Sequence, residues 1–254
     1  MSSLWDCRPQ ESAPTSQSLA RTLIVHYNLP MAKTEIALAQ LLNYAPVPLA
    51  FGTSGLRGLV RDITDLEAYI NVKGALRYLL GTGDIRANSR VVIAGDLRPS
   101  TERIMRACVQ AIFDSGCQVE IAGKIPTPAL VFHAISQQSA GIMVTGSHIP
   151  FDRNGIKINK SVGEVVKSDE AGIIGEVEGV RAEEYRRSAT VSPFDACGML
   201  KRAPELPPID GAAEQSYVRR YIDCFRRGGL AGLRVLVYQH SAVGRDLLPR
   251  ILRE

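Results

Sequence analysis

The chain has 254 residues, 45% of them hydrophobic, which is enough to bury one sizeable core and to hold one domain plus part of another. The formal net charge of +4 is small and the basic residues are scattered, so the composition excludes a dedicated nucleic-acid-binding tract. Five cysteines without a Cys-x-x-Cys pair argue against a disulfide framework or a zinc site. No apolar run is long enough for a membrane span, and we expect a cytoplasmic protein.

The N-terminal stretch, residues 1–47, precedes the stronger patterns. It begins with a loose segment that contains serine and proline, and it then shows helical periodicity near residues 19–25 and 32–42. We expect an N-terminal helical extension here, which packs against the first domain or mediates self-association.

Alternating helices and strands follow this extension. Thr64 and Glu67 have the spacing of a capping box, and apolar residues then recur at helical period up to Gly81. The later patterns predict strands at 90–94, 118–122 and 141–145 and helices at 101–116 and 127–137. This alternation predicts an α/β fold with a mainly parallel mixed sheet sandwiched by helices.

The stretch 141–158 sets a serine, Ser147, at the end of an apolar strand. Gly146 lets the backbone come close to a ligand. The dipeptide Asn154-Gly155 favours a tight turn, after which a second short strand carries Lys157. We interpret this stretch as an active-site loop with room for a bulky anion.

Two further loops are expected at the same edge of the sheet. Loop 51–58 reads Phe-Gly-Thr-Ser-Gly-Leu-Arg-Gly, so free backbone amides can face an anion and Arg57 can contact a phosphate in bidentate fashion. Loop 95–101 reads Gly-Asp-Leu-Arg-Pro-Ser-Thr and joins a strand to a helix. Because such sheets bind ligands at the carboxyl ends of their strands, these loops and the Ser147 loop should form one site.

These motifs resemble those of the α-D-phosphohexomutases, the phosphoglucomutase and phosphomannomutase group. The segment 145–150, Thr-Gly-Ser-His-Ile-Pro, is similar to the family's phosphoserine loop, whose usual form is Thr-Ala-Ser-His-Asn-Pro followed by Asn-Gly-x-Lys. Gly146 and Ile149 depart from the common alanine and asparagine. Loops 51–58 and 95–101 resemble the family's first two loops, and all three motifs occur in family order. The resemblance covers about residues 48–254.

The resemblance implies an isomerase that interconverts hexose 1-phosphate and hexose 6-phosphate through a phosphoserine and a bisphosphate intermediate. It implies that Ser147 carries the phosphoryl group, that Lys157 is the general acid/base and that His148 orients or assists the transferring group. The implied phosphate-binding residues are Thr53, Ser54, Arg57 and Arg98. The implied cofactors are Mg²⁺, held in part by the phosphate on Ser147, and hexose 1,6-bisphosphate as activator. The implied partner is a hexose phosphate, with no nucleic acid and no membrane.

The last part of the sequence predicts the start of a second α/β domain. A helix is expected at 215–227, a strand at 233–238 and a helix from Asp246 onward. The expected domains are therefore 1–47, the N-terminal extension; 48–205, the phosphoserine domain; and 206–254, an incomplete second domain. The Asp-x-Asp-x-Asp metal loop of the family does not occur in the sequence, and we expect a product truncated before that loop.

Several interpretations stay open on the sequence. The chain is either the N-terminal part of a phosphohexomutase or a non-catalytic remnant or binding module that retains a sugar-phosphate site, and a separate chain carrying the remaining domains is a third alternative. A serine hydrolase is disfavoured because no Gly-x-Ser-x-Gly elbow occurs and because adjacent side chains, Ser147 and His148, are expected to leave a strand end in different directions.

Overall fold

A computed structural model describes residues 35–52, 55–225 and 229–254. The residues from Glu35 onward belong to one compact unit. Thr53 and Ser54, two of the predicted phosphate-binding residues, lie outside the described residues, as does the helix predicted at 19–25.

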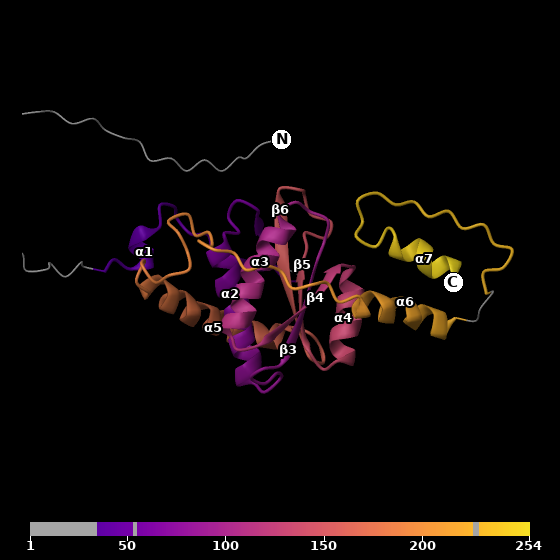
Figure 1. Ribbon diagram of the computed structural model, residues 1–254, viewed down its shortest axis with the longest axis horizontal. Coiled ribbons are helices and arrows are strands. Elements are labelled where there is room, and N and C mark those ends of the chain that lie inside the picture. The colour runs from indigo at the N-terminus through magenta and orange to yellow at the C-terminus, as the bar shows by residue number, and fades with distance from the viewer. Residues whose placement is uncertain (1–34, 53–54, 226–228) are drawn as a thin grey trace, which may run out of the picture. The chain divides into compact units, whose positions relative to one another are not determined.

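A mixed sheet forms the centre of the described part of the chain, with strand order β1-β2-β6-β5-β3-β4 and β7 paired to β6 (Figure 1). The strands are β1 (Ala50–Phe51), β2 (Leu56–Leu59), β3 (Arg90–Gly95), β4 (Gln118–Lys124), β5 (Ala140–Val144), β6 (Arg153–Lys160) and β7 (Gly163–Glu164). The helices are α1 (Leu38–Leu41), α2 (Asp65–Gly81), α3 (Thr101–Asp114), α4 (Thr127–Ser136), α5 (Lys167–Arg186), α6 (Ala212–Cys224) and α7 (Leu247–Arg253). The predicted α/β class and the mixed sheet are confirmed.

Parallel pairs are confined to one side of the sheet and do not predominate as expected. β3 pairs in parallel with β4 and β5. β5 then turns directly into β6, which also pairs in antiparallel fashion with β2 and β7. The expectation failed because the crossover helices occur only between β3, β4 and β5, whereas β5 and β6 form a hairpin.

The predicted turn at Asn154-Gly155 is wrong, because both residues lie inside β6. The Asn154 side chain is buried, and its amide nitrogen donates to Ser100 Oγ at 2.9 Å and to Thr101 Oγ1 at 3.2 Å. An added Cβ at Gly155 would lie 2.5 Å from the carbonyl oxygen of Leu56. Asn154 and Gly155 therefore allow β6 to pack closely against β2 and the start of α3. These contacts override the preference of the dipeptide for a turn.

The two faces of the sheet carry different helices. One face contributes Ile93, Ile142 and Ile156 to a large core with α2, α3 and α5. The opposite face contributes Val92 and Met143 to a smaller core with α4 and α6. Figure 1 shows α2, α3 and α5 on one side of the strands and α4 and α6 on the other.

The smaller-core face also carries the cationic side chains of Arg57 and Lys157. Lys157 is the register partner of Met143, and Arg57 is the partner of Gly155 in the neighbouring pair of strands. Because side chains alternate along a strand and register partners share a face, Arg57 and Lys157 are diagonal neighbours on the face that bears Met143. α4 packs over β3 and β5, so these cations lie beside the part of the face that α4 covers.

Local signals at the helix ends were predictive. Thr64 is the N-cap of α2, and its hydroxyl oxygen accepts from the backbone N–H of Glu67 at 3.2 Å. α2 ends at Gly81, as the apolar periodicity predicted. None of the helices in the described part of the chain combines the length and apolar character that a bilayer-spanning segment requires.

The strand predicted at 233–238 is wrong, since this stretch has no regular secondary structure. Leu236 and Tyr238 are 94% and 89% exposed. A lone strand is not stable without a pairing partner, and within the described residues no strand pairs with this stretch. The helices predicted on either side of it are confirmed as α6 and α7. α6 packs against α4, and the domain boundaries near residues 47 and 205 stay predictions.

Candidate functional site

The loop between β5 and β6 presents Ser147 to solvent directly beyond the end of β5, as the sequence predicted. Ser147 has a positive φ of 51°, which places a residue with a side chain in the left-handed region. Its backbone N–H donates to Thr145 Oγ1 at 2.9 Å, and the N–H of Ile149 donates to the Gly146 carbonyl at 3.0 Å. The loop is therefore a tight turn with internal hydrogen bonds.

His148 lies against the serine hydroxyl, which corrects the expectation that the two side chains diverge. Its Nδ1 is 3.3 Å from Ser147 Oγ, and both residues are exposed. In an extended backbone the two side chains would point to opposite sides, whereas the positive φ at Ser147 turns the chain so that consecutive side chains meet. A proton on the serine oxygen thus has an imidazole nitrogen beside it.

Asp96, at the end of β3, organises the loop from below. Its carboxylate accepts from the Thr145 hydroxyl at 2.9 Å and from the Gly146 N–H at 3.0 Å. It also accepts from the N–H of Arg98 and from the hydroxyl of Thr101, within its own loop. Asp96 is only 8% exposed. Sequence reasoning recorded the motif 95–101 but missed this role, because the partners are some 50 residues away.

Arg98 lies under the same loop, with a side chain that is 11% exposed. Its guanidinium donates to the loop carbonyls of Ile149 (2.6 Å), Pro150 (2.8 Å), Arg153 (3.0 Å) and Ser147 (3.5 Å). Its Nε is 3.4 Å from Asp96 Oδ2. The structure places Arg98 at the site, but its guanidinium donates to carbonyls of the protein and is not turned toward solvent.

The side chains of Arg57 and Lys157 are half-buried and, unlike that of Arg98, have no ion-pair or hydrogen-bond partner among the described residues. They flank the β1–β2 turn, in which the N–H of Gly52 donates to the carbonyl of Gly55 at 2.9 Å. Gly55 has φ +75°, and an added Cβ would lie 2.8 Å from Lys157 Cγ. The predicted first loop therefore lies against the predicted acid/base residue.

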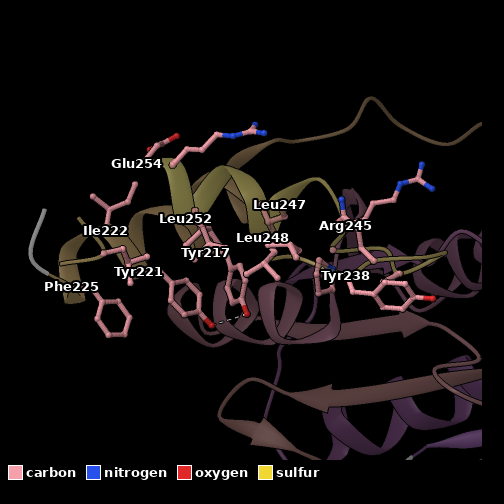
Figure 2. A pocket seen from close by; sticks show the side chains of 18 of the residues that line it. Tyr217, Tyr221, Ile222, Phe225, Tyr238, Arg245, Leu247, Leu248, Leu252 and Glu254 are labelled. Carbon is pink, nitrogen blue, oxygen red and sulfur yellow. Dashed lines mark hydrogen bonds between the residues drawn. The ribbon is translucent and has the colours of Figure 1, made fainter. Parts of the chain in front are cut away.

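A cavity of about 1170 Å³ reaches Ser147 from the C-terminal part of the chain. Figure 2 shows its other walls, which are mostly apolar and include Tyr217, Tyr221, Phe225 and Leu247. The two tyrosine hydroxyls are 3.0 Å apart, and burial together with this contact raises the pKa of Tyr217 to about 12. The lining also includes polar side chains from the C-terminal segment, among them His240, Ser241 and Arg245.

A magnesium site does not follow from the described residues. They contain no group of three or more histidine, cysteine, aspartate or glutamate side chains arranged to hold a metal ion. Asp96, the carboxylate under the loop, has both oxygens occupied by protein donors. A phosphate on Ser147 would supply oxygen ligands but not a coordination sphere. The residues present do not fit the ion on their own.

The fold and site define an α/β/α domain that presents an exposed serine loop at the carboxyl end of β5, an interior strand of a mixed sheet. A protein from Thermus thermophilus, whose solved structure is described as that of a candidate phosphomannomutase, shares this fold with a TM-score of 0.61. The two are 22% identical, and the match covers 82% of this chain and 44% of the other.

Sequence comparisons identify the family. Residues 48–184 match Phosphoglucomutase/phosphomannomutase, alpha/beta/alpha domain I, and the chain belongs to this family. It is 35% identical to a phosphomannomutase of Sinorhizobium fredii over 204 residues, which are 80% of this chain and 40% of the relative. It is 31% identical to a phosphoglucosamine mutase of Kineococcus radiotolerans over 209 residues, again 80% of this chain, and 44% of the relative. The chain thus spans less than half the length of these relatives.

Proposed function

We propose that this chain provides the phosphoserine domain of a phosphohexomutase, which interconverts hexose 1-phosphate and hexose 6-phosphate. The observation that carries the proposal is the exposed Ser147 hydroxyl, set at positive φ with His148 Nδ1 3.3 Å away. Membership of the family supports it. Because the chain spans about 40% of the curated phosphomannomutases it matches, the complete cycle is proposed for the phosphoserine domain acting with the remaining domains of such enzymes.

In the proposed first step, the phosphoryl group of phospho-Ser147 moves to a free hydroxyl of a hexose monophosphate. The bond from phosphorus to Ser147 Oγ breaks, and a bond from phosphorus to the sugar oxygen forms. The proton of the sugar hydroxyl passes to Lys157 as general base, and the serine oxygen takes a proton from His148 to become a hydroxyl. The product of this step is a hexose bisphosphate.

In the proposed second step, the bisphosphate turns over and returns its other phosphoryl group to Ser147. The bond from phosphorus to the departing sugar oxygen breaks as a bond from phosphorus to Ser147 Oγ forms; the serine proton passes to His148, and Lys157 gives its proton to that sugar oxygen. The net reaction is isomerisation, and the phosphoserine is restored. Hexose 1,6-bisphosphate therefore serves as the reagent that loads an unmodified Ser147.

The neighbouring side chains have proposed roles that follow from their contacts. His148 is in reach of the serine oxygen and assists when that oxygen gains or loses a proton. Arg57 lies on the face that bears Lys157, and its side chain has no partner within the part of the chain that the structure describes. With Thr53 and Ser54 it is proposed to bind phosphate. Mg²⁺ is proposed for the complete enzyme only, since the described residues do not fit it, and no step above depends on it.

The phosphoserine step can be tested directly. The purified chain is incubated with hexose 1,6-bisphosphate, with and without Mg²⁺ and a separately produced C-terminal portion of the Sinorhizobium fredii relative. We expect intact-mass analysis to show one added phosphoryl group, which maps to Ser147 and is absent from Ser147→Ala. If no condition modifies Ser147 in folded protein, the proposal is wrong, and sugar phosphate binding without transfer would favour a binding module.

A further inference from the structure

We infer that Arg98 is a positioning residue that holds the Ser147 loop in shape, and that the missing side chain at Gly146 is what allows it to do so. The inference deepens the proposed function and depends on it only for the role of Ser147. It replaces phosphate binding as the role of this guanidinium.

Loop carbonyls occupy both terminal nitrogens of the Arg98 guanidinium. An arginine side chain carries five N–H donors in a fixed fork. Nη1 donates to the carbonyls of Pro150 and Arg153, and Nη2 donates to those of Ile149 and Ser147. Nε lies 3.4 Å from Asp96 Oδ2 and forms an ion pair with it. A phosphate could reach this group only by displacing loop carbonyls. By contrast, Arg57 has no partner among the described residues and is free to meet one.

The guanidinium occupies the space that a side chain at position 146 would need. An added Cβ at Gly146 would lie 2.3 Å from Arg98 Cζ and Nε and 2.7 Å from Nη2. The end of an arginine can swing away from such a clash, but here it would give up its bonds to the loop carbonyls. Gly146 and Arg98 are therefore coupled, and the departure from alanine at 146 has a physical reason within this chain.

The coupling acts on Ser147 through its backbone. Gly146 donates its N–H to Asp96, and Asp96 also faces Arg98 Nε. Ser147, the next residue, has the positive φ, and its own carbonyl is one of the guanidinium acceptors. Removing the guanidinium frees the carbonyl of Ser147 and the carbonyls of the loop that follows it, so the left-handed backbone is no longer enforced.

The test measures loop geometry without phosphoryl transfer. Arg98→Ala, Gly146→Ala and the double variant are compared with the parent by hydrogen exchange of amides 146–153 and by the Cα and Cβ chemical shifts of Ser147, which report φ. We expect each single variant to speed exchange in this loop by at least about tenfold and to shift Ser147 away from left-handed values. Exchange in α2 serves as the control for global unfolding.

The decisive comparison is the double variant. Gly146→Ala should have little further effect once Arg98 is alanine, because the clash has been removed. Arg98→Lys, which keeps the charge but not the fork, should restore only part of the protection. Unchanged loop exchange and Ser147 shifts in Arg98→Ala, or fully additive effects in the double variant, would overturn the inference. If Arg98→Ala does not fold, Gly146→Ala alone still tests the inference, because the added methyl group moves the guanidinium away from the loop carbonyls while the arginine stays in the sequence. Because no readout needs turnover, failure of Ser147 to become phosphorylated is a separate result.

Discussion

At the scale of single residues, Ser147 depends on groups that never touch its side chain. Its N–H bonds to Thr145, whose hydroxyl bonds to Asp96. Asp96 is a buried acceptor surrounded by donors from two loops. A carboxylate suits this position because it accepts at both oxygens and donates at neither.

Asp96→Asn should therefore destabilise the chain. The amide NH₂ of asparagine would face N–H and O–H groups that now donate to the carboxylate, so one or more of them would lose an acceptor. We expect a loss of about 3 kcal/mol in the free energy of unfolding. Urea denaturation measures this loss. Asp152→Asn, on an exposed side chain of the Ser147 loop, is the matched control and should change the free energy by no more than about 0.5 kcal/mol. Equal effects of the two substitutions would contradict the assigned role of Asp96.

At the scale of elements, several ion pairs join α2 to α5, and two of them differ clearly in burial. Arg181 donates to Glu67 at 2.6 and 2.8 Å in the interior, and both side chains are at most 10% exposed. Arg77 donates to Glu183 at 2.8 Å through both terminal nitrogens near the surface. The buried carboxylate also accepts from the N–H of Leu49, which ties the chain before β1 to α2.

Glu67→Gln should cost far more stability than Glu183→Gln. The first leaves a buried guanidinium without its counter-charge, at about 3 kcal/mol, whereas the second removes an exposed pair worth under about 1 kcal/mol. Urea denaturation of both variants at neutral pH measures the difference. A Glu183→Gln effect as large as that of Glu67→Gln would refute the claim that burial decides the contribution.

The start of α5 gives a prediction about pH. Burial raises the pKa of Asp169, but Lys160, the N–H of Val166 and the hydroxyl of Tyr78 all bond to its carboxylate and bring the pKa below its ordinary value. A carboxylate whose pKa is lowered in the folded state stabilises the fold at any pH above the pKa that it has in the unfolded chain. This contribution is lost as the pH falls through the folded-state pKa.

Asp169→Asn should thus be destabilising near neutral pH, by about 1–2 kcal/mol. The gap between variant and parent should close only in acid, below about pH 4, where the carboxyl of the unfolded chain is protonated. Unfolding free energies measured from pH 7 down to pH 3 check this course. A gap that stays constant over the whole range would speak against a titrating contribution from Asp169.

At the scale of the whole molecule, local patterns predicted the helices well and the strand pairing less well. α2, α3 and α4 were recognisable from caps and periodicity, which depend on residues a few positions apart. The hairpin of β5 and β6 was missed because an Asn-Gly dipeptide read as a turn is a strand segment when Asn154 finds partners in α3. The motifs located the Ser147 loop, but not the contacts from Asp96 and Arg98, because these form only when distant segments pack together.

The larger core also predicts how the thiols react. Cys108 on α3 is fully buried, and burial raises the pKa of its thiol above its ordinary range. Cys224 is exposed at the end of α6. At mildly alkaline pH we expect a thiol reagent to modify Cys224 rapidly and Cys108 only at the rate of global unfolding, with sites assigned by peptide mass. Rapid modification of Cys108 in folded protein would contradict the packing described for α3.

The hairpin of β5 and β6 has one more consequence for the proposed cycle. The Ser147 loop is held at both ends by adjacent interior strands, and its carbonyls accept hydrogen bonds from the Arg98 guanidinium. In the proposed cycle, we therefore expect the backbone that carries the seryl phosphate to stay in place between the two half-reactions. Reorientation between the two half-reactions then falls to the small molecule, which must rotate end over end before a stationary nucleophile.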